Sequence, residues 1–415
     1  MFWVLLQRRL VGKPVPRFAM VRCRKFSISV IALLALLTIK IFIDLNYPPL
    51  LSSDPTSVSP EPEKNPLPML ESLQDDEASA MTALQSLAQN LRKLVPPSGA
   101  FWNIEQLQLL DLKKPWAWTC SKSTTQIKRV ESYPELLLSF VSQDHCRNHR
   151  MIINQPDKCP GNRTFLLLAI KSSPQNFAQR QAVRDTWGAE KNYEGKYVRL
   201  VFLLGTVPTL DLSPLLGYEN SRSHDLLQWD FADTFLNLTL KDQLFLGWAK
   251  TYCARATYIL KGDDDVFVRT PNIVRVLSSL GSHRHRTLYM GHVVKLAKPY
   301  RDPHSKYYIP TSFYLGMYPP YAGGGGYLFS GSLTPWLYLV SHFVFPYPID
   351  DVYTGMCFMA LGVKPVGHPG FKTFSMPREK SSSCSEKSLL LVHQKSPREI
   401  LKMWGEDFET TNQQC

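Results

Sequence analysis

The sequence predicts an α/β fold with a parallel sheet, because two buried-strand patterns are separated by a helical one. Residues 164–172, TFLLLAIKS, and 197–205, YVRLVFLLG, are continuous apolar runs of strand length. Such runs are typical of strands that are covered on both faces. The segment NFAQRQAVRDTWG between them has a helical pattern that ends at Gly188. A strand, a helix and a strand in this order indicate a βαβ unit with parallel strands.

A third strand pattern ends at three consecutive carboxylates. Residues 257–262, TYILKG, follow a helical pattern over 240–256 and run directly into Asp263, Asp264 and Asp265. In open α/β sheets, ligands bind beyond the carboxyl ends of the strands. Because neighbouring carboxylates near a core repel one another, the pattern favours a divalent cation at this point. The alternative is an exposed acidic turn that caps the helix after it.

Two arginines and a run of glycines are the candidates for nucleotide binding. Arg180 and Arg184 are four residues apart on one helix face after a strand end, where they could clamp a diphosphate. Gly324 and Gly325 lie in the run AGGGG with apolar flanks, which favours a strand-edge position where a ligand approaches the backbone. The alternatives are a solvated helix face for the arginines and a flexible loop for the glycines.

The phosphate-binding signatures of other nucleotide-binding folds do not occur in this sequence. The segment KSSPQN follows the first strand in place of G-x-G-x-x-G, and there is no G-x-x-x-x-G-K-[ST] motif. A bound diphosphate would therefore have to be held by a metal ion and by basic side chains.

Two later segments supply candidate catalytic and metal-binding residues. YPIDDVYTGMCFMALG opens a predicted helix with Asp350 and Asp351. One of the two carboxylates can serve as the N-cap, the simpler role for Asp350, while the other faces a substrate. LLLVHQK ends an apolar run with His393, which is a candidate metal ligand or a structural histidine.

The N-terminal region has the composition of a membrane anchor followed by a stem. Residues 1–25 are basic and contain no acidic residue, and residues 26–43 form an apolar run with one lysine. The positive-inside rule then predicts a type II protein with a cytosolic tail at 1–25 and a transmembrane signal anchor at 26–43. Residues 44–100 are predicted to be a stem with one amphipathic helix over 70–94. The rest is expected to be a lumenal catalytic domain, 101–415, with its core at 160–415.

Charge, cysteines and sequons agree with this topology. Much of the net charge of +12 lies in the N-terminal tail, so no nucleic-acid partner is indicated. Seven of the eight cysteines fall on the lumenal side, where most should pair and the odd number leaves at least one free or intermolecular. The absence of C-x-x-C argues against a zinc module. Sequons at Asn162 and Asn237 agree with the secretory route.

Five motifs together resemble those of glycosyltransferase family 31, the inverting, metal-dependent β-1,3-glycosyltransferases with a GT-A type fold. They occur in the family's order and spacing over residues 120–415: RQAVRDTWG, DFADTFLNLTLKD, ILKGDDDVFVRT, YPPYAGGGGYLFSG and PIDDVYTGMC. KYYIP, GFKTF and LLLVH are similar to the β-1,3-N-acetylglucosaminyltransferase branch, which extends poly-N-acetyllactosamine. The implied fold is a Rossmann-like nucleotide-binding sheet with helices on both faces.

The resemblance assigns roles to the candidate residues by their positions. Asp263, Asp265 and His393 would bind Mn²⁺. Asp351 would be the general base, with Asp350 as the other candidate. The positions that would contact the donor UDP-GlcNAc are Arg180, Arg184, Asp263, Asp264, Gly324 and Gly325.

The implied activity is transfer of N-acetylglucosamine from UDP-GlcNAc in β-1,3 linkage to a terminal galactose of N-acetyllactosamine-type glycans. Metal and arginines would stabilise the charge on the leaving UDP without a proton donor, and one aspartate would take the proton of the acceptor hydroxyl. The expected partners are a nucleotide-sugar donor, galactose-terminated acceptors and the Golgi membrane, with a homo- or hetero-dimer left open. The alternatives are a β-1,3-galactosyltransferase on the same scaffold, an inactive lectin-like binding protein and a metal-dependent sugar-nucleotide hydrolase.

Overall fold

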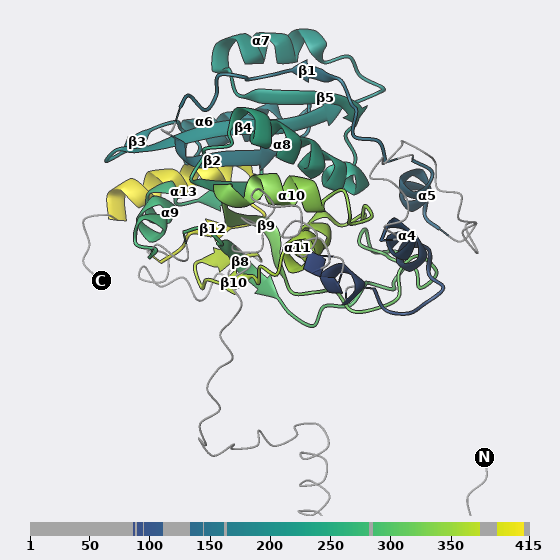
Figure 1. The fold of residues 1–415 in the computed structure, drawn as a ribbon. Helices are drawn as coiled ribbons and strands as arrows, with labels where there is room; N and C mark the ends of the chain where they lie inside the picture. The colour runs from purple at the N-terminus through teal and green to yellow at the C-terminus, as the bar shows by residue number, and fades with distance from the viewer. Residues whose placement is uncertain are drawn as a thin grey trace, which may run out of the picture. The chain divides into compact units, whose positions relative to one another are not determined.

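A mixed sheet of nine strands lies at the centre of the described part of the chain (Figure 1). The computed structural model describes residues 86–87, 89–93, 95–110, 133–143, 145–161, 164–281, 285–373 and 388–410. The order along the sheet is β1 (Met151–Ile153), β5 (Leu226–Ala232), β4 (Lys196–Thr206), β2 (Thr164–Lys171), β6 (Tyr258–Asp263), β9 (Tyr321–Ser330), β8 (Tyr289–Val294) and β10 (Val366–Gly367), with β3 (Asn192–Tyr193) paired to β4.

Four neighbouring strands, β5, β4, β2 and β6, form a parallel block. Helix α6 (Phe177–Asp185) connects β2 to the region that leads into β4, which confirms the predicted βαβ unit. All eight residues of β2 are buried, as expected for a strand that is covered on both faces. Strand β9 runs antiparallel to both β6 and β8, so the sheet is mixed. The predicted α/β class and its three strand patterns are confirmed.

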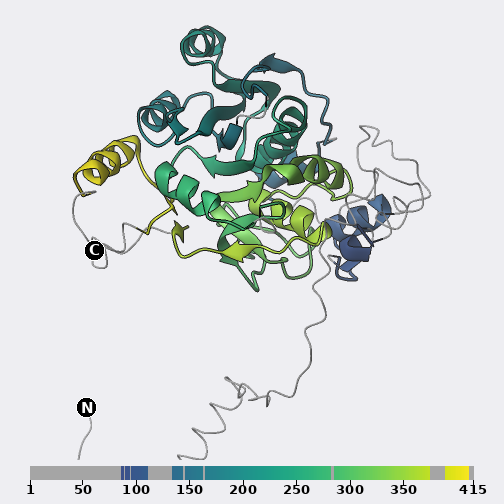
Figure 2. The ribbon, with the colours of Figure 1, turned by 60° about the vertical axis from the view of Figure 1, so that its left-hand side comes forward.

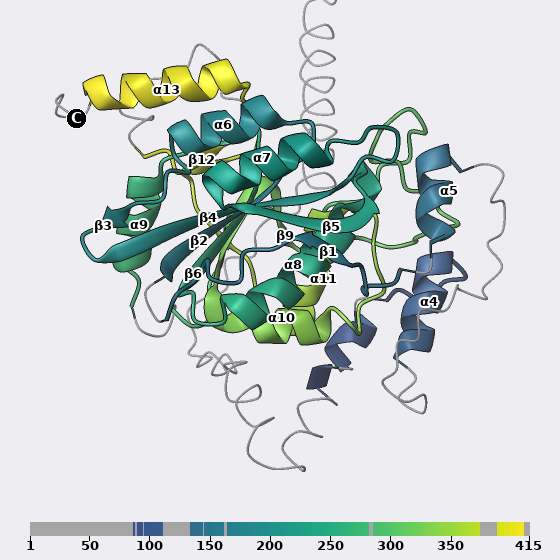
Figure 3. The same cartoon turned by 90° about the horizontal axis from the view of Figure 1, so that it is seen from above.

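Helices cover both faces of the sheet (Figure 3). On one face, Leu166, Leu168 and Ile170 of β2 share a core with α6, α7 (Ser213–Ser223), α9 (Thr270–Ser278) and α13 (Pro397–Thr410). On the other face, Leu167 and Ala169 share a core with α8 (Leu238–Tyr252), α10 (Thr334–Val340) and α11 (Asp350–Ala360). The C-terminal helix α13 lies beside α6 (Figure 2). Successive side chains of β2 point to opposite faces of the sheet, so this one strand contributes to two separate hydrophobic cores.

A smaller sheet of three strands brings the C-terminal segment to the acidic triplet. Its strands are β11 (Phe371–Lys372), β12 (Leu391–Val392) and β7 (Phe267–Val268). Strand β7 begins two residues after Asp265, and β12 pairs with it antiparallel, with Val392 opposite Phe267. This register carries the next residue, His393, to the end of β7 where the aspartates lie.

Residues of the segment 86–110 pack into the main core, so the folded domain includes residues before 101, where the sequence predicted its start. Leu87, Leu91 and Val95 are buried core residues, and Asn90 Nδ2 donates to the carbonyl oxygen of Ala360 at 3.2 Å. Helices α4 (Phe101–Leu109) and α5 (Glu135–Val141) contribute to the same core. The prediction that the stem extends to residue 100 is therefore wrong, because the segment from residue 86 onward packs on the folded domain.

The membrane prediction concerns residues that the structure does not describe. Within the described ranges, no helix is long and apolar enough to cross a membrane. The tail at 1–25 and the expected anchor at 26–43 lie outside these ranges, as do Cys23, Cys120, Cys384, Cys415 and Asn162.

The described cysteines agree with the expectation of paired thiols and an unpaired one. Cys159 and Cys253 form a disulfide, and Cys146 is also disulfide-bonded. Cys357 is a free thiol buried in α11. The sequon at Asn237 is closed to a glycan in the folded chain, because this side chain is buried and its Nδ2 donates to the carbonyl oxygen of Ala232 at 2.9 Å.

Replacing Trp102 tests whether the N-terminal segment is part of the folded domain. Trp102 is fully buried, and its Nε1 donates to the carbonyl oxygen of Phe345 at 3.0 Å. Trp102→Ala is expected to lower the free energy of unfolding by about 3–5 kcal/mol, since it leaves a large cavity. Leu107→Ala on the same helix is the control, because Leu107 is 45% exposed and should lose less than about 0.5 kcal/mol. Equal losses in denaturant titrations of both variants would contradict the packing.

Candidate active site

The carboxyl ends of β2 and β6 place a lysine and three aspartates side by side. Lys171, the last residue of β2, is the register partner of Asp263, the last residue of β6. Lys171 Nζ lies 3.1 Å from Asp263 Oδ1. Asp264 and Asp265 follow at the same edge, so the triplet lies where a ligand of an open α/β sheet is expected.

Asp263, Asp265 and His393 form a cluster that could hold a metal ion. One ligand atom from each lies within 4.8 Å of the others. His393 Nε2 is 3.1 Å from Asp265 Oδ1 and 3.7 Å from Asp263 Oδ2. The backbone fixes the approach, because Lys395 N–H donates to the carbonyl oxygen of Asp265 at 2.8 Å. The structure therefore brings together the three residues that the sequence predicted as ligands.

The donor atoms of this cluster fit a divalent cation. Asp265 Oδ1 is buried, and its close polar neighbour is His393 Nε2 at 3.1 Å. When the imidazole is neutral and presents its lone pair, it gives this oxygen no donor, and a cation shared by the two groups would satisfy both. Two carboxylates and one imidazole form a mixed oxygen and nitrogen set that suits a borderline divalent ion such as Mn²⁺.

The charge state of His393 depends on the two aspartates. Burial alone would lower the pKa of His393, but the hydrogen bond and charge of Asp265, with the charge of Asp263, outweigh burial and raise the pKa. A metal ion requires the neutral ring. Protons and metal therefore compete for His393, and acid should weaken metal binding.

Asp264 turns away from this cluster and holds the loop after β2. Its side chain is 7% exposed, and Oδ2 accepts hydrogen bonds from Ser172 Oγ at 2.6 Å and Asn176 Nδ2 at 2.9 Å. Burial raises the pKa of Asp264, while these two hydrogen bonds lower it in part. Contact of Asp264 with a sugar nucleotide stays a prediction, and the contacts that the structure shows are with this loop.

Arg180 is a buried structural residue and not an open nucleotide ligand. Its side chain is completely buried, and its five N–H donors are all engaged within the chain. Two go to Glu219 at 2.7 and 2.8 Å, and the other three go to Ser172 Oγ and to the carbonyl oxygens of Ser173 and Pro174. The prediction that Arg180 clamps the diphosphate is wrong, because no donor is left for it.

Arg184 is also held by acidic residues from the neighbouring elements. Its Nε donates to Asp225 Oδ2 at 2.7 Å, and one terminal nitrogen donates to both Glu219 and Asp225. Its guanidinium stacks over the Phe202 ring at 4.9 Å. The prediction of a UDP contact is not supported for this residue either. Both arginines instead fix α6 to Glu219 of α7. Arg184 also binds Asp225, just before β5, and Arg180 fixes the loop that supports Asp264.

Asp350 and Asp351 begin α11 and differ in their surroundings. Asp350 is buried, and its Oδ2 accepts a hydrogen bond from Lys171 Nζ in an ion pair. The N-cap position is Ile349, so the expected capping role of Asp350 is replaced by this ion pair. Asp351 is half-buried, and no ion pair or hydrogen bond to another described residue holds its carboxylate. The carboxylate of Asp351 is therefore the one available to a substrate.

Burial makes Asp351 a stronger base than an ordinary aspartate. Loss of water raises its pKa well above the usual value, the charge of Asp350 raises it further, and Lys171 lowers it in part. Burial would also lower the pKa of Lys171, but Asp263 and Asp350 outweigh burial and raise that pKa well above its ordinary value. Lys171 thus stays protonated between the two halves of the site.

The glycine run makes room for His393. Strand β9 lies between β6 and β8, so the predicted strand-edge position is wrong. Gly325 has φ +81°, and a Cβ there would lie 2.7 Å from His393 Cγ. A Cβ on Gly324 would lie 3.7 Å from His393 Nδ1 and 3.9 Å from Asp351 Oδ2. The glycines are needed for close approach, but at Gly325 the approaching group is a side chain of this chain.

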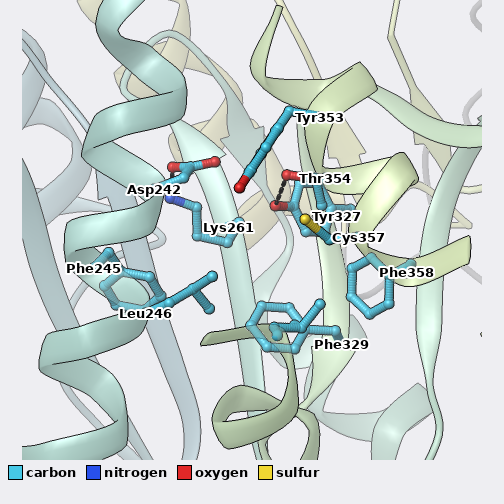
Figure 4. Close-up of a pocket in the computed structure, with 11 residues that line it drawn as sticks. Asp242, Phe245, Leu246, Lys261, Tyr327, Phe329, Tyr353, Thr354, Cys357 and Phe358 are labelled. Atoms are coloured by element: carbon cyan, nitrogen blue, oxygen red, sulfur yellow. Dashed lines mark hydrogen bonds and ion pairs between the residues drawn. The ribbon is translucent and has the colours of Figure 1, made fainter. Parts of the chain in front are cut away.

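A small cavity behind the site is a structural feature and not a ligand pocket. It lies between α8, β6, β9 and α11 and has a volume of about 20 Å³, enough for one water molecule (Figure 4). Lys261 donates to Asp242 at its wall, and Lys261 also lies 4.9 Å from the Phe245 ring centroid. Burial raises the pKa of Asp242 and lowers the pKa of Lys261.

Comparison with known proteins identifies the family. The galactosyltransferase family model matches residues 178–369, which contain the acidic triplet, the glycine run and both aspartates of α11. Human N-acetyllactosaminide beta-1,3-N-acetylglucosaminyltransferase 2 is 41% identical over 341 residues, which cover 76% of this chain and 86% of the relative. The chain belongs to the galactosyltransferase family. The resemblance to glycosyltransferase family 31 in the motifs is therefore confirmed.

Two further relatives are similar over 92% and 72% of this chain. Human UDP-GlcNAc:betaGal beta-1,3-N-acetylglucosaminyltransferase 8 is 36% identical over 404 residues, with 92% of this chain and 97% of the relative covered. Mouse N-acetyllactosaminide beta-1,3-N-acetylglucosaminyltransferase 4 is 42% identical over 302 residues, with 72% and 85% covered. A crystal structure of a galactosyltransferase with donor and acceptor sugar analogues matches with 11% identity and a TM-score of 0.31, over 59% of this chain and 94% of that one, too weak to carry an argument.

Sequence reasoning missed Lys171, the residue that links the two halves of this family member's site. The available signal was a lysine at the carboxyl end of an otherwise apolar strand, next to the strand that ends in the triplet. It also missed Thr373, whose Cγ2 would lie 3.1 Å from a Cβ on Gly324. No local pattern marks Thr373, because its place depends on the pairing of β11 with β12.

The raised pKa of Asp351 predicts opposite stability effects at the two aspartates. A folded-state pKa above the unfolded value means that Asp351 disfavours folding once it ionises, so its contribution falls as pH rises through that window. In metal-free buffer, Asp351→Asn should raise the free energy of unfolding at neutral pH and give no gain below about pH 4. Asp350→Asn should lower it by about 1–3 kcal/mol, because Lys171 loses one buried partner. Denaturant titrations at several pH values between acidic and neutral measure the free energy of unfolding of both variants. A lower free energy of unfolding of Asp351→Asn at neutral pH would contradict the raised pKa of Asp351.

Proposed function

We propose that this protein is an inverting enzyme that transfers N-acetylglucosamine from UDP-GlcNAc in β-1,3 linkage to a terminal galactose of N-acetyllactosamine-type glycans. One observation carries the proposal. The Asp-Asp-His cluster and the carboxylate of Asp351, whose pKa is raised, lie on the two sides of Gly324, which has no side chain to separate them. The relatives are named β-1,3-N-acetylglucosaminyltransferases, and their similarity covers up to 92% of this chain. These names support the proposed donor and linkage.

The Asp-Asp-His cluster provides the leaving-group side of the site. A divalent ion, proposed to be Mn²⁺, would be held by Asp263, Asp265 and His393 and would stabilise the negative charge of the departing diphosphate. Lys171 holds Asp263 in place from the other side through its ion pair at 3.1 Å. Since Arg180 and Arg184 are engaged elsewhere, this cluster and Lys171 are the basis for donor binding.

Asp351 provides the acceptor side of the site. Its Oδ2 would accept the proton of the galactose hydroxyl while that oxygen attacks the anomeric carbon, and the bond to the diphosphate breaks on the opposite face. A base with a pKa nearer to the working pH takes up this proton more effectively. Attack opposite to the leaving group converts an α-linked donor into a β-linked product.

Exposed aromatic side chains near Asp351 suit the apolar face of a sugar ring. Tyr300 is 63% exposed and Tyr307 is 38% exposed, and their ring centroids are 6.1 Å apart. Tyr321 packs on α11, the helix that Asp351 begins, since a Cβ on Gly355 would lie 2.5 Å from Tyr321 Cβ. Burial raises the pKa of Tyr321, and the charge of Asp351 raises it further. Such aromatic faces are proposed to orient the acceptor over the base.

The cellular setting and the fold type form a further part of the proposal. The basic tail and apolar run at the N-terminus support a single-pass type II protein of the Golgi membrane with a lumenal catalytic domain. The mixed sheet with helices on both faces supports a GT-A type fold. Association as a homo- or hetero-dimer is left to measurement of the mass in solution.

A panel of donors and acceptors tests the reaction. Purified full-length protein with Mn²⁺ should transfer N-acetylglucosamine from UDP-GlcNAc to N-acetyllactosamine, and excess chelator should abolish the transfer until Mn²⁺ is restored. UDP-galactose is the comparison donor, because the matching family is described as galactosyltransferase. Preference for UDP-galactose would replace the proposed donor. UDP release that is independent of acceptor would indicate a hydrolase.

Replacing the proposed base separates catalysis from binding. Asp351→Asn should lower kcat by about 10²–10⁴-fold, the usual contribution of a general base, and should leave the KM for UDP-GlcNAc nearly unchanged. Asp230→Asn serves as the control, since Asp230 is an exposed residue of β5 and its variant should retain full activity. Undiminished transfer by Asp351→Asn would refute the role of Asp351.

A further inference from the structure

An open pocket lies beside the candidate active site at the ends of β8, β10 and β11. Its volume is about 620 Å³, within the range of small-molecule sites. Strand β8 is antiparallel to β9, and β9 is antiparallel to β6, so β8 ends at the same edge of the sheet as β6. Strand β10 is parallel to β8 and ends there as well. The pocket is therefore on the ligand-binding edge of the sheet.

The lining of this pocket is basic. Its ionisable side chains are two lysines and two histidines, and none of the lining residues is acidic: His292, Lys295, His368 and Lys372. None of these four makes an ion pair with another residue of the described ranges. Arg180, Arg184, Lys171, Lys241 and Lys261 are by contrast all paired with carboxylates. Burial lowers the pKa of His368, so the charge of the lining comes from Lys295 and Lys372. Two cations without an acidic partner in the described ranges, both beside one cavity, attract an anion.

Thr373 connects the pocket to the catalytic groups. It lines the pocket, it is 8% exposed, and its Oγ1 is buried without a hydrogen-bond partner among the described residues. A Cβ placed on Gly324 would lie 3.1 Å from Thr373 Cγ2 and 3.9 Å from Asp351 Oδ2, so these two side chains flank the same glycine. An unsatisfied buried hydroxyl is costly, and a bound acceptor oxygen would remove that cost. The pocket thus begins next to the proposed base.

We propose that this pocket is an acceptor subsite that holds an anionic substituent of the glycan, either a sulfate ester or a carboxylate, while the terminal galactose faces Asp351. The inference rests on the proposed transfer to galactose. Lysine side chains and the Thr373 hydroxyl are hydrogen-bond donors, and an oxyanion offers several acceptors to such a set. A neutral sugar alone would leave the lysines without a counter-charge from the described part of the chain.

The position of the pocket favours the acceptor over the diphosphate of the donor. Strands β8 and β10 lie beyond β9 in the main sheet, so Lys295 is separated by β9 from the proposed metal ligands that follow β6. Strand β11 instead pairs with β12 in the smaller sheet, and His393 N–H donates to the carbonyl oxygen of Lys372 at 3.1 Å. The β8 side of the pocket therefore favours the acceptor, and the KM for UDP-GlcNAc tests whether Lys372 contacts the donor instead.

Acceptor kinetics of the full-length protein test the proposal. The ratio of kcat/KM for an N-acetyllactosamine acceptor with an added sulfate ester, or with an added carboxylate, to that for the neutral acceptor should exceed one and should decline as ionic strength rises. Lys295→Gln and Lys372→Gln should each lower the ratio for the favoured anion by roughly 3- to 10-fold. Lys298→Gln is the matched control, because Lys298 is exposed three residues from Lys295 and does not line the pocket. Thermal melting confirms that the variants are folded.

Each result decides the proposal. A ratio above one that falls in both pocket variants and not in the control supports it, and the better of the two acceptors identifies the anion. A ratio of one or below, an equal fall in Lys298→Gln, or a rise in the KM for UDP-GlcNAc as the main effect of the pocket variants would overturn it. If the protein transfers to the neutral acceptor and prefers no anionic acceptor, the anionic subsite is refuted and the proposed transfer reaction stands. If it transfers to no acceptor, both the subsite and the proposed function are refuted.

Discussion

The ion pairs of Lys171 hold the candidate active site together. A single buried ammonium group contacts Asp263 at the end of β6 and Asp350 at the start of α11. Without it, several carboxylates would face one another in a region of low dielectric constant, where like charges repel strongly. Lys171 stands at the end of β2, a fully buried strand inside the sheet, so this strand sets the spacing between the proposed metal ligands and the proposed base.

The same charge explains why adjacent aspartates differ. Asp350 is neutralised by Lys171, whereas Asp351 remains without such a contact and is raised in pKa by burial and by Asp350. An enzyme of this kind needs one carboxylate that supports the architecture and one that can take up a proton. Two consecutive residues on a helix point in different directions, which lets a single turn of α11 provide both.

Much of the fold could be read from the sequence because its signals are local. The apolar run of β2, the triplet after β6 and the paired aspartates of α11 are all visible within ten residues. The arginine prediction failed because the partner of Arg180 is Glu219, on a different helix, and no pattern at 180–184 reveals it. The stem boundary failed for a similar reason, since an amphipathic pattern does not tell what its apolar face will contact. The glycine run was predicted to let a ligand approach the backbone, and that contact stays a prediction. The group that approaches Gly325 in the structure is the side chain of His393, which strand pairing brings there.

The packing of residues 86–110 has a consequence for how an active fragment could leave the proposed membrane anchor. Leu87, Leu91 and Trp102 fill the core on the face of the sheet that also carries α11. A protease that cut between these positions would remove part of that core and loosen the helix that bears Asp351. A cut upstream of Leu87 would leave the described part of this core in place, so proteolytic release from the proposed anchor would have to occur before that residue.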